Sequence, residues 1–173
     1  NFRKGNFSKF KKMLNPLQET KNIYKMREKY EERELKEFSI LFLVINNLDI
    51  FRKNIELISE VTFSNNLMNE FKKKLIDYLL SEKFFDRKKL HIEDFDKKFN
   101  NIIELINNNA PVKIIYKNKH DDEIVLMFSE IVDEIKKIEL RKKIESLEDK
   151  VSLNLDENLY TELLSLRNQL KRG

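Results

Sequence analysis

The spacing of apolar residues predicts that this chain is built from long helices. The clearest case is the segment from Asp122 to Val151, where a helical pattern continues without Gly or Pro and predicts one helix roughly 44 Å long. In its first half the apolar residues fall on one stripe, which consists of Ile124, Met127, Phe128, Ile131, Ile135 and Ile138.

In the second half of this segment the apolar stripe moves to nearly the opposite side. At about 100° per residue, the later apolar residues keep helical spacing but point away from the first stripe. They are Leu140, Ile144, Leu147 and Val151. We therefore expect the first half to close a core formed by the preceding chain, and the second half to pair with the helix that follows. A helix break near Glu139 is the alternative explanation of the pattern.

The apolar seam of the last helix matches the second stripe of the long helix, which predicts a C-terminal antiparallel helical hairpin over residues 139–173. Its N-cap is expected at Asn154 or Asp156, and Asn154 followed by Glu157 resembles a capping box. The hairpin packing is assigned to Leu140, Ile144, Leu147, Leu159, Leu163, Leu166 and Leu170. The last helix also carries a second stripe of residues beside this seam. Its composition fits an interface hot spot, and ordinary solvent-exposed surface is the alternative. The stripe consists of Tyr160, Leu164, Arg167 and Lys171.

Upstream of the hairpin, residues 31–138 are expected to form a helical bundle subdomain. A helix from Glu31 to Asn46 is apolar on every side over residues 40–45, which predicts a central, buried position. A shorter helix is expected to continue over residues 48–58.

The rest of the bundle contains two further predicted helices. Asn65 is the expected N-cap of a helix that runs to about Leu80, and the lysines at 72–74 are expected to form solvated surface. Residues 92–106 have the most regular amphipathic pattern in the bundle and predict another helix. Residues 112–116 fit either a short extended segment or a helical turn.

The composition indicates an all-α fold. Charged residues make up 37% and hydrophobic residues 40%, while the chain has only 2 Gly and 2 Pro, so turns are few. The absence of Cys excludes disulfides and thiolate metal sites and fits a reducing, cytoplasmic compartment. No apolar run approaches the ~18 residues that a membrane span needs, so no membrane partner is expected.

The net charge of +4 is unevenly distributed. Residues 1–30 carry nine Lys/Arg and two Asp/Glu, so their charge is +7 and that of the remainder is −3. Basic residues interleaved with Phe2, Phe7 and Phe10 suit nucleic acid, but a short amphipathic helix or a frayed terminus also explains them. We interpret residues 1–30 as a basic lead-in or a linker from a preceding catalytic domain, and the lack of an initiator Met fits a fragment.

No catalytic constellation is found in the sequence. His91 and His120 each stand near acidic residues, which raises the possibility of a metal site, but both lie at expected helix starts, where acids complement the helix dipole. The two glycines, Gly5 and Gly173, do not form a phosphate-binding loop. We therefore expect no enzyme activity, no metal and no cofactor in this chain.

Three stretches share their order and spacing with a known family. The first is residues 34–47, with an acidic start, an apolar helix and an Asn-containing end. The second is Phe63-Ser64 followed by Leu67, Phe71, Leu75 and Leu79-Leu80, and the third is residues 155–172, which end on basic residues. Over roughly residues 31–173 they resemble the C-terminal, helicase-binding domain of bacterial DnaG-type DNA primases. One departure is Leu48, where the family often has Pro.

The resemblance implies a helical bundle followed by a hairpin that docks on the N-terminal domains of the hexameric replicative helicase. Such a domain recruits primase to the replication fork for RNA primer synthesis and modulates helicase activity. Zinc, magnesium and most contacts with single-stranded DNA would belong to preceding domains. The expected helicase-binding residues are Tyr160, Leu164, Arg167, Lys171 and Arg172. A hinge near Ile138–Leu140 would also permit a hairpin-swapped dimer.

Two other functions fit parts of the pattern. The N-terminal domain of the replicative helicase itself has a similar bundle-and-hairpin architecture, but it would continue into a linker and a phosphate-binding domain. A basic helical module that binds nucleic acid through residues 1–30 and the lysine clusters would show affinity that falls steeply with salt.

Overall fold

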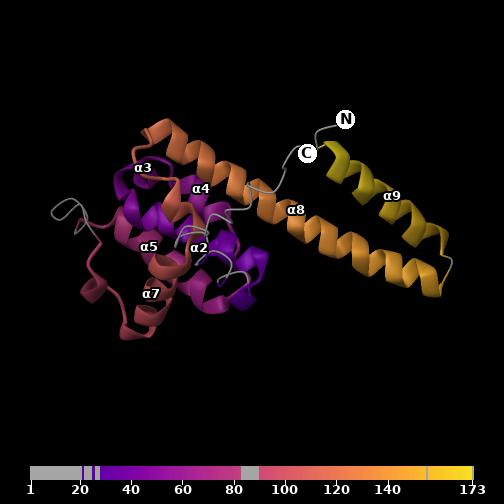
Figure 1. The fold of residues 1–173 in the computed structure, drawn as a ribbon, viewed down its shortest axis with the longest axis horizontal. Helices are drawn as coiled ribbons and strands as arrows, with labels where there is room; N and C mark the ends of the chain where they lie inside the picture. Colours follow the sequence, from indigo (N-terminus) through magenta and orange to yellow (C-terminus); the bar gives the residue numbers. More distant parts are fainter. Residues whose placement is uncertain (1–20, 22–24, 26–27, 83–89, 155, 173) are drawn as a thin grey trace, which may run out of the picture.

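The computed structural model describes residues 21, 25, 28–82, 90–154 and 156–172. These residues form helices, turns and loops with no strand among them, so the predicted all-α fold class is confirmed. Figure 1 shows a cluster of helices from which α8 extends as a long arm, with α9 folded back beside it. The elements are α2 (Glu32–Asn46), α3 (Leu48–Lys53), α4 (Ile55–Glu60), α5 (Asn66–Leu80), η1 (Ile92–Asp94), η2 (Lys97–Phe99), α7 (Asn100–Asn109), η3 (Pro111–Ile114), α8 (Asp121–Leu153) and α9 (Glu157–Arg172).

Helix α2 is the centre of the main hydrophobic core. It begins with a capping box, in which the Glu31 N–H donates to the Glu34 carboxylate at 3.0 Å. It ends at Asn47, whose side chain donates to the carbonyl of Leu43 at 2.8 Å. The central position, with burial on most sides, that the sequence predicts for this helix is confirmed. The side chains of this helix with no exposed area belong to Glu37, Ile40, Leu41, Leu43 and Val44.

Asparagine side chains set several helix boundaries. The helix expected over residues 48–58 is divided at Asn54 into α3 and α4, because Asn54 leaves helical geometry (φ −121°, ψ 40°). Its side chain donates to the carbonyl of Ile50 at 2.9 Å, which satisfies a group at the end of α3. The predicted N-cap Asn65 is confirmed, since its side chain accepts a hydrogen bond from the Leu67 N–H at 2.8 Å.

Lys72 differs from the solvated lysine surface expected at residues 72–74. It is only 9% exposed, and its ammonium donates to the carbonyls of Ser59 at 3.1 Å and Val61 at 2.6 Å, at the end of α4. Burial lowers the pKa of Lys72, and the charge of Lys73 lowers it further. The expectation was wrong for Lys72 because the free carbonyls at a helix C-terminus attract a cation. Lys73 and Lys74 are exposed.

Helix α7 starts later than the sequence pattern predicts. The helix expected over residues 92–106 is confirmed from Asn100 onward, whereas residues 92–99 form two 3-10 turns separated near Asp96. Phe95 and Phe99 both contact Phe71 of α5, with ring centroids 5.4 and 5.5 Å apart respectively. Apolar residues three or four positions apart suit 3-10 turns as well as an α-helix, so this aromatic packing is compatible with either structure.

Residues 112–116, for which the sequence left two possibilities open, are not extended. Most of this stretch belongs to the 3-10 helix η3, and the Tyr116 ring packs edge-on against Phe42 of α2 with centroids 5.0 Å apart. The chain then turns through Asn118, whose positive φ of 64° is one that Asn tolerates well. This turn leads into α8.

Helix α8 is one continuous helix of 33 residues, so the alternative of a break near Glu139 is wrong. At about 1.5 Å per residue it is roughly 50 Å long. Its first half contributes Ile124, Phe128 and Ile135 to the main core. Its second half belongs to a separate hydrophobic cluster with α9.

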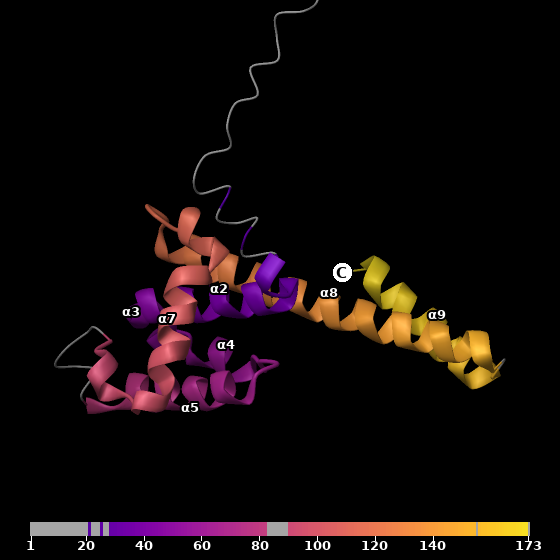
Figure 2. The same cartoon turned by 60° about the horizontal axis from the view of Figure 1, so that its bottom comes forward.

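Helix α9 is capped by Asp156, one of the two expected N-caps. The Asp156 carboxylate accepts a hydrogen bond from the Asn158 N–H at 2.8 Å. Asn154 instead ends α8, since its N–H donates to the carbonyl of Lys150 at 2.9 Å. Figures 1 and 2 both show the pair of α8 and α9 protruding from one side of the bundle, with the C-terminal end of α9 directed back toward it.

Candidate functional site

The hairpin of α8 and α9 has a small hydrophobic core of its own. Ile144 and Leu147 of α8 and Leu163 and Leu166 of α9 are each at most 8% exposed. Every residue that the sequence analysis assigns to hairpin packing lies in this cluster. The partly buried members are Leu140, Val151, Leu159 and Leu170.

Two ion pairs join α8 and α9 across the hairpin. Lys143 pairs with Glu162 at 3.2 Å, and the Arg167 guanidinium pairs with Glu148 at 2.6 Å. At about 100° per residue the two pairs lie on opposite sides of the apolar seam. The four side chains are 40–59% exposed, so each pair contributes only ~0.2–1 kcal/mol. The apolar seam is therefore the main source of hairpin stability.

Four of the five expected helicase-binding residues line one side of α9, whereas Arg172 lies roughly 110° from the middle of their stripe at about 100° per residue. Tyr160 is 51% exposed and Leu164 42%, and Lys171 and Arg172 are exposed too. At about 100° per residue, the stripe from Tyr160 to Lys171 occupies roughly 60° of arc beside the seam. Arg167 belongs to this stripe but is held by Glu148, so its charge is already partly compensated.

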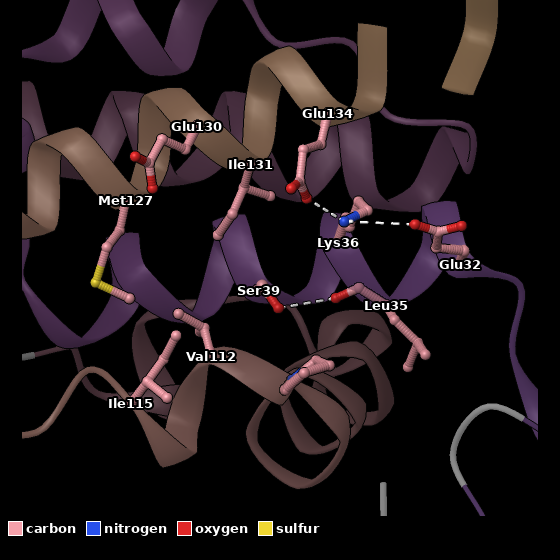
Figure 3. A pocket seen from close by; sticks show the side chains of 11 residues that line it. Glu32, Leu35, Lys36, Ser39, Val112, Ile115, Met127, Glu130, Ile131 and Glu134 are labelled. Atoms are coloured by element: carbon pink, nitrogen blue, oxygen red, sulfur yellow. Dashed lines mark hydrogen bonds and ion pairs between the residues drawn. The ribbon is translucent and has the colours of Figure 1, made fainter. Parts of the chain in front are cut away.

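A groove opens in the bundle between α2, η3 and α8, with a volume of about 330 Å³. Figure 3 shows Ile115 and Val112 on one side of it and Met127 and Ile131 of α8 on the other. Ile115 is 61% exposed, so a large aliphatic side chain is accessible to a ligand at this groove. Sequence reasoning missed this groove, because Ile115 lies in the stretch whose conformation was left open.

Carboxylates dominate the rim of the groove. Among the described residues that line it, Glu32, Glu130 and Glu134 stand against one cation, Lys36. The Lys36 ammonium pairs with Glu134 and, at 3.5 Å, with Glu32 (Figure 3). Two negative charges therefore remain in excess around an apolar floor, which suits a ligand with apolar side chains and positive charge.

The groove and the exposed stripe of α9 lie on the same side of α8. At about 100° per residue, Glu130 and Glu134 of the groove and Glu148 of the hairpin fall within roughly 40° of one another around the α8 axis. Glu148 in turn holds Arg167 of the α9 stripe. One side of the molecule thus presents both surfaces.

A buried carboxylate ties α8 to the bundle where the hairpin begins. Glu37 has no exposed area and accepts hydrogen bonds from the Arg33 Nε at 2.9 Å, the Ser64 N–H at 2.8 Å and the Ser64 hydroxyl at 2.7 Å. Arg33 also pairs with Glu139 of α8 at 2.6 Å. Next to this junction, Lys142 donates to Glu31 at 2.8 Å, which lowers the pKa of Glu31.

The described part of the chain contains no group of three or more His, Cys, Asp and Glu side chains that could hold a metal ion. His91 and His120, the two histidines considered for such a site, are both exposed. His120 is the N-cap residue of α8, and its N–H donates to the Glu123 carboxylate at 3.0 Å. An acid in the first turn is favourable because it complements the positive end of the helix dipole. Among the described helices, none is long and apolar enough to cross a membrane.

Comparison of the chain with family models, with curated proteins and with solved structures finds no match. The basic lead-in assigned to residues 1–30 falls mostly outside the described residues.

Proposed function

We propose that this chain is a non-catalytic docking module that binds a protein partner through the exposed side of its C-terminal hairpin. The observation that carries the proposal is the pair formed by Tyr160 and Leu164, which are 51% and 42% exposed on a helix whose apolar seam is already satisfied by α8. Large apolar side chains that are not needed for folding are typical of binding anchors.

The shape of the molecule supports this proposal. The hairpin extends away from the bundle, so a partner can approach α9 without meeting the helices of the main core (Figure 2). Tyr has a large apolar ring and a hydroxyl that hydrogen-bonds, and it is enriched among residues that dominate binding energy. Lys171 and Arg172 follow in the last turn of α9 and would steer an acidic partner toward this side.

The family resemblance supplies the identity of the partner. We infer that the hairpin binds the N-terminal domains of the hexameric replicative helicase and thereby recruits a primase to the replication fork in the cytoplasm. Tethering raises the local concentration of the catalytic domains on single-stranded template without any new contact with DNA. Primer synthesis, with its zinc and magnesium, would belong to domains outside this chain. The bundle would modulate the helicase by binding one of its conformations better than another.

Calorimetric titration of this chain with the replicative helicase of the same organism tests the proposal. We expect binding with a Kd of about 1 μM or tighter. Tyr160→Ala and Leu164→Ala should each weaken it by about 1–2 kcal/mol, or roughly 5- to 30-fold, because each removes an apolar anchor. Ser165→Ala, an exposed position on α9 that lies off this stripe, is the matched control and should bind normally.

Folding of each variant is checked by circular dichroism and thermal unfolding, since Tyr160 and Leu164 lie outside the hydrophobic clusters and their loss should leave the fold intact. Unchanged affinity of both folded variants would remove α9 as the binding surface. A complete lack of binding by the unmodified chain at moderate salt would refute the helicase as partner.

A further inference from the structure

The groove between α2, η3 and α8 is not used by the proposed hairpin contact, and its chemistry specifies a ligand. Its floor is apolar, with Ile115 61% exposed, and the charged groups on its rim in the described part of the chain are Glu32, Glu130 and Glu134 against Lys36. Its volume of about 330 Å³ is enough for a few apolar side chains. A complementary ligand would therefore be a short basic segment with large apolar residues.

The chain itself contains such a segment. Residues 1–14 carry five Lys/Arg and no Asp or Glu. Phe7, Phe10 and Leu14 follow the spacing i, i+3, i+7, which would put them on one face of a helix, while Lys9, Lys11 and Lys12 stand between them. The sequence thus combines the two properties that the groove requires.

The connection between this segment and the groove is long enough. The groove begins at Glu32 and Leu35, in the first turns of α2, and Tyr30 already packs against Phe38, so residues 15–27 are the tether. Even in fully helical form these residues would span roughly 20 Å, and in extended form about 43 Å. A tether of this length gives an effective concentration on the order of millimolar, so that an intrinsically weak contact is occupied.

We propose that the basic segment of residues 2–14 docks in the acidic-rimmed groove of its own chain, with Phe7 and Phe10 on the apolar floor and Lys9, Lys11 and Lys12 facing the carboxylates. This assigns a role to the uneven charge distribution, since residues 1–30 carry a net charge of +7 and the remainder of the chain carries −3. The proposal is independent of the helicase and goes beyond the docking function of the hairpin.

Paramagnetic relaxation enhancement on the full chain tests the docking. Because the chain has no Cys, Ser8→Cys provides one unique site for a nitroxide label. We expect the methyl signals of Ile115 and Ile131, on the two sides of the groove, to be broadened beyond detection. The methyl signal of Ile144, in the hairpin seam, is the internal reference and should persist.

Reversing the charge of one residue on the groove and one on the segment distinguishes specific docking from nonspecific proximity of the label. Glu130→Lys on the groove rim should restore the Ile115 and Ile131 signals, and adding Lys11→Glu to it should broaden them again. Glu145→Lys, an exposed position in the hairpin half of α8, is the matched control and should leave the broadening intact. Salt at ~1 M, where the Debye length is about 3 Å, should also weaken the docking.

Three results would overturn the proposal. The first is equal signal intensity at Ile115, Ile131 and Ile144, and the second is broadening that persists in Glu130→Lys. The third is broadening in isotope-labelled chains that carry no nitroxide when they are mixed with nitroxide-labelled chains, because a second copy would then fill the groove. None of these results depends on helicase binding, so the two proposals fail separately.

Discussion

Glu37 is a fully buried carboxylate in the middle of an apolar helix, and its three hydrogen bonds explain why it is tolerated. In Glu37→Ala, the Ser64 N–H and hydroxyl would lose their acceptor, and the partly buried Arg33 guanidinium would lose one of its two carboxylate partners and keep Glu139. We expect the free energy of unfolding to fall by about 3 kcal/mol, which urea denaturation measures. Glu56→Ala, at an exposed position of α4, is the control and should change stability by less than about 0.5 kcal/mol.

A second residue-scale prediction concerns pH at the start of α8. The Lys119 ammonium donates to Glu123 at 2.7 Å and the His120 N–H donates at 3.0 Å, and both hydrogen bonds lower the pKa of Glu123 below its ordinary value of 4.5. Because the pKa is lower in the folded state, the stabilisation is present above pH 4.5 and is lost as the pH falls through the folded pKa.

An NMR titration of the Glu123 carboxyl carbon checks this shift. Lys119→Met should raise the pKa of Glu123 toward 4.5 without reaching it, because the His120 N–H remains as a donor. Lys117→Met removes a nearby exposed lysine and should leave the pKa unchanged. If both variants shift it equally, general electrostatics rather than the Lys119 hydrogen bond would be responsible.

At the scale of elements, the hairpin is expected to open independently of the bundle, because its hydrophobic cluster is separate from the main core. Leu163→Ala removes a buried side chain from the seam and should weaken the hairpin by about 2–3 kcal/mol. Hydrogen exchange should then accelerate in α9 and in the second half of α8, but not in α2. Ser165→Ala is the control, and equal acceleration in α2 would show that the two clusters unfold together.

The helices that could be predicted from sequence are those whose pattern of apolar residues fits only one secondary structure. The apolar run of α2 and the change of stripe in α8 both require long helices, and the structure has them. Lys72 could not be placed, because its burial depends on the carbonyls of Ser59 and Val61 in another element. The groove likewise depends on how η3 meets α2 and α8, which no local pattern reports.

The candidate contact surface on α9 was predictable for a related reason. Tyr160 and Leu164 stand beside a complete leucine seam, so the sequence shows that they are surplus to hairpin packing, and they are exposed. The involvement of Arg167 with Glu148 was not predictable, because it depends on the register of α9 against α8.

At the scale of the whole molecule, α8 is the element that fixes the hairpin relative to the bundle. It is uninterrupted across residue 139, where Arg33 reaches it from α2. A continuous helix of this kind bends little, so the exposed side of α9 should keep a constant direction relative to the groove. A label on Glu56→Cys in α4 and another on Asp149→Cys near the hairpin tip, both at exposed positions of a chain without Cys, allow this to be measured.

Electron–electron resonance between the two labels should give a single narrow distance distribution. Glu139→Pro should broaden it, because Pro lacks the N–H that bonds the carbonyl four residues earlier and its ring clashes there, which costs about 3 kcal/mol or more in a helix interior. Glu139→Ala is the matched control, since it also removes the ion pair with Arg33 but keeps the helix. A narrow distribution in Glu139→Ala would assign the rigidity to α8 itself, whereas broadening in both variants would assign it to the Arg33 contact. A broad distribution in the unmodified chain would mean that the hairpin presents Tyr160 and Leu164 in many directions, and a partner would then have to select one of them.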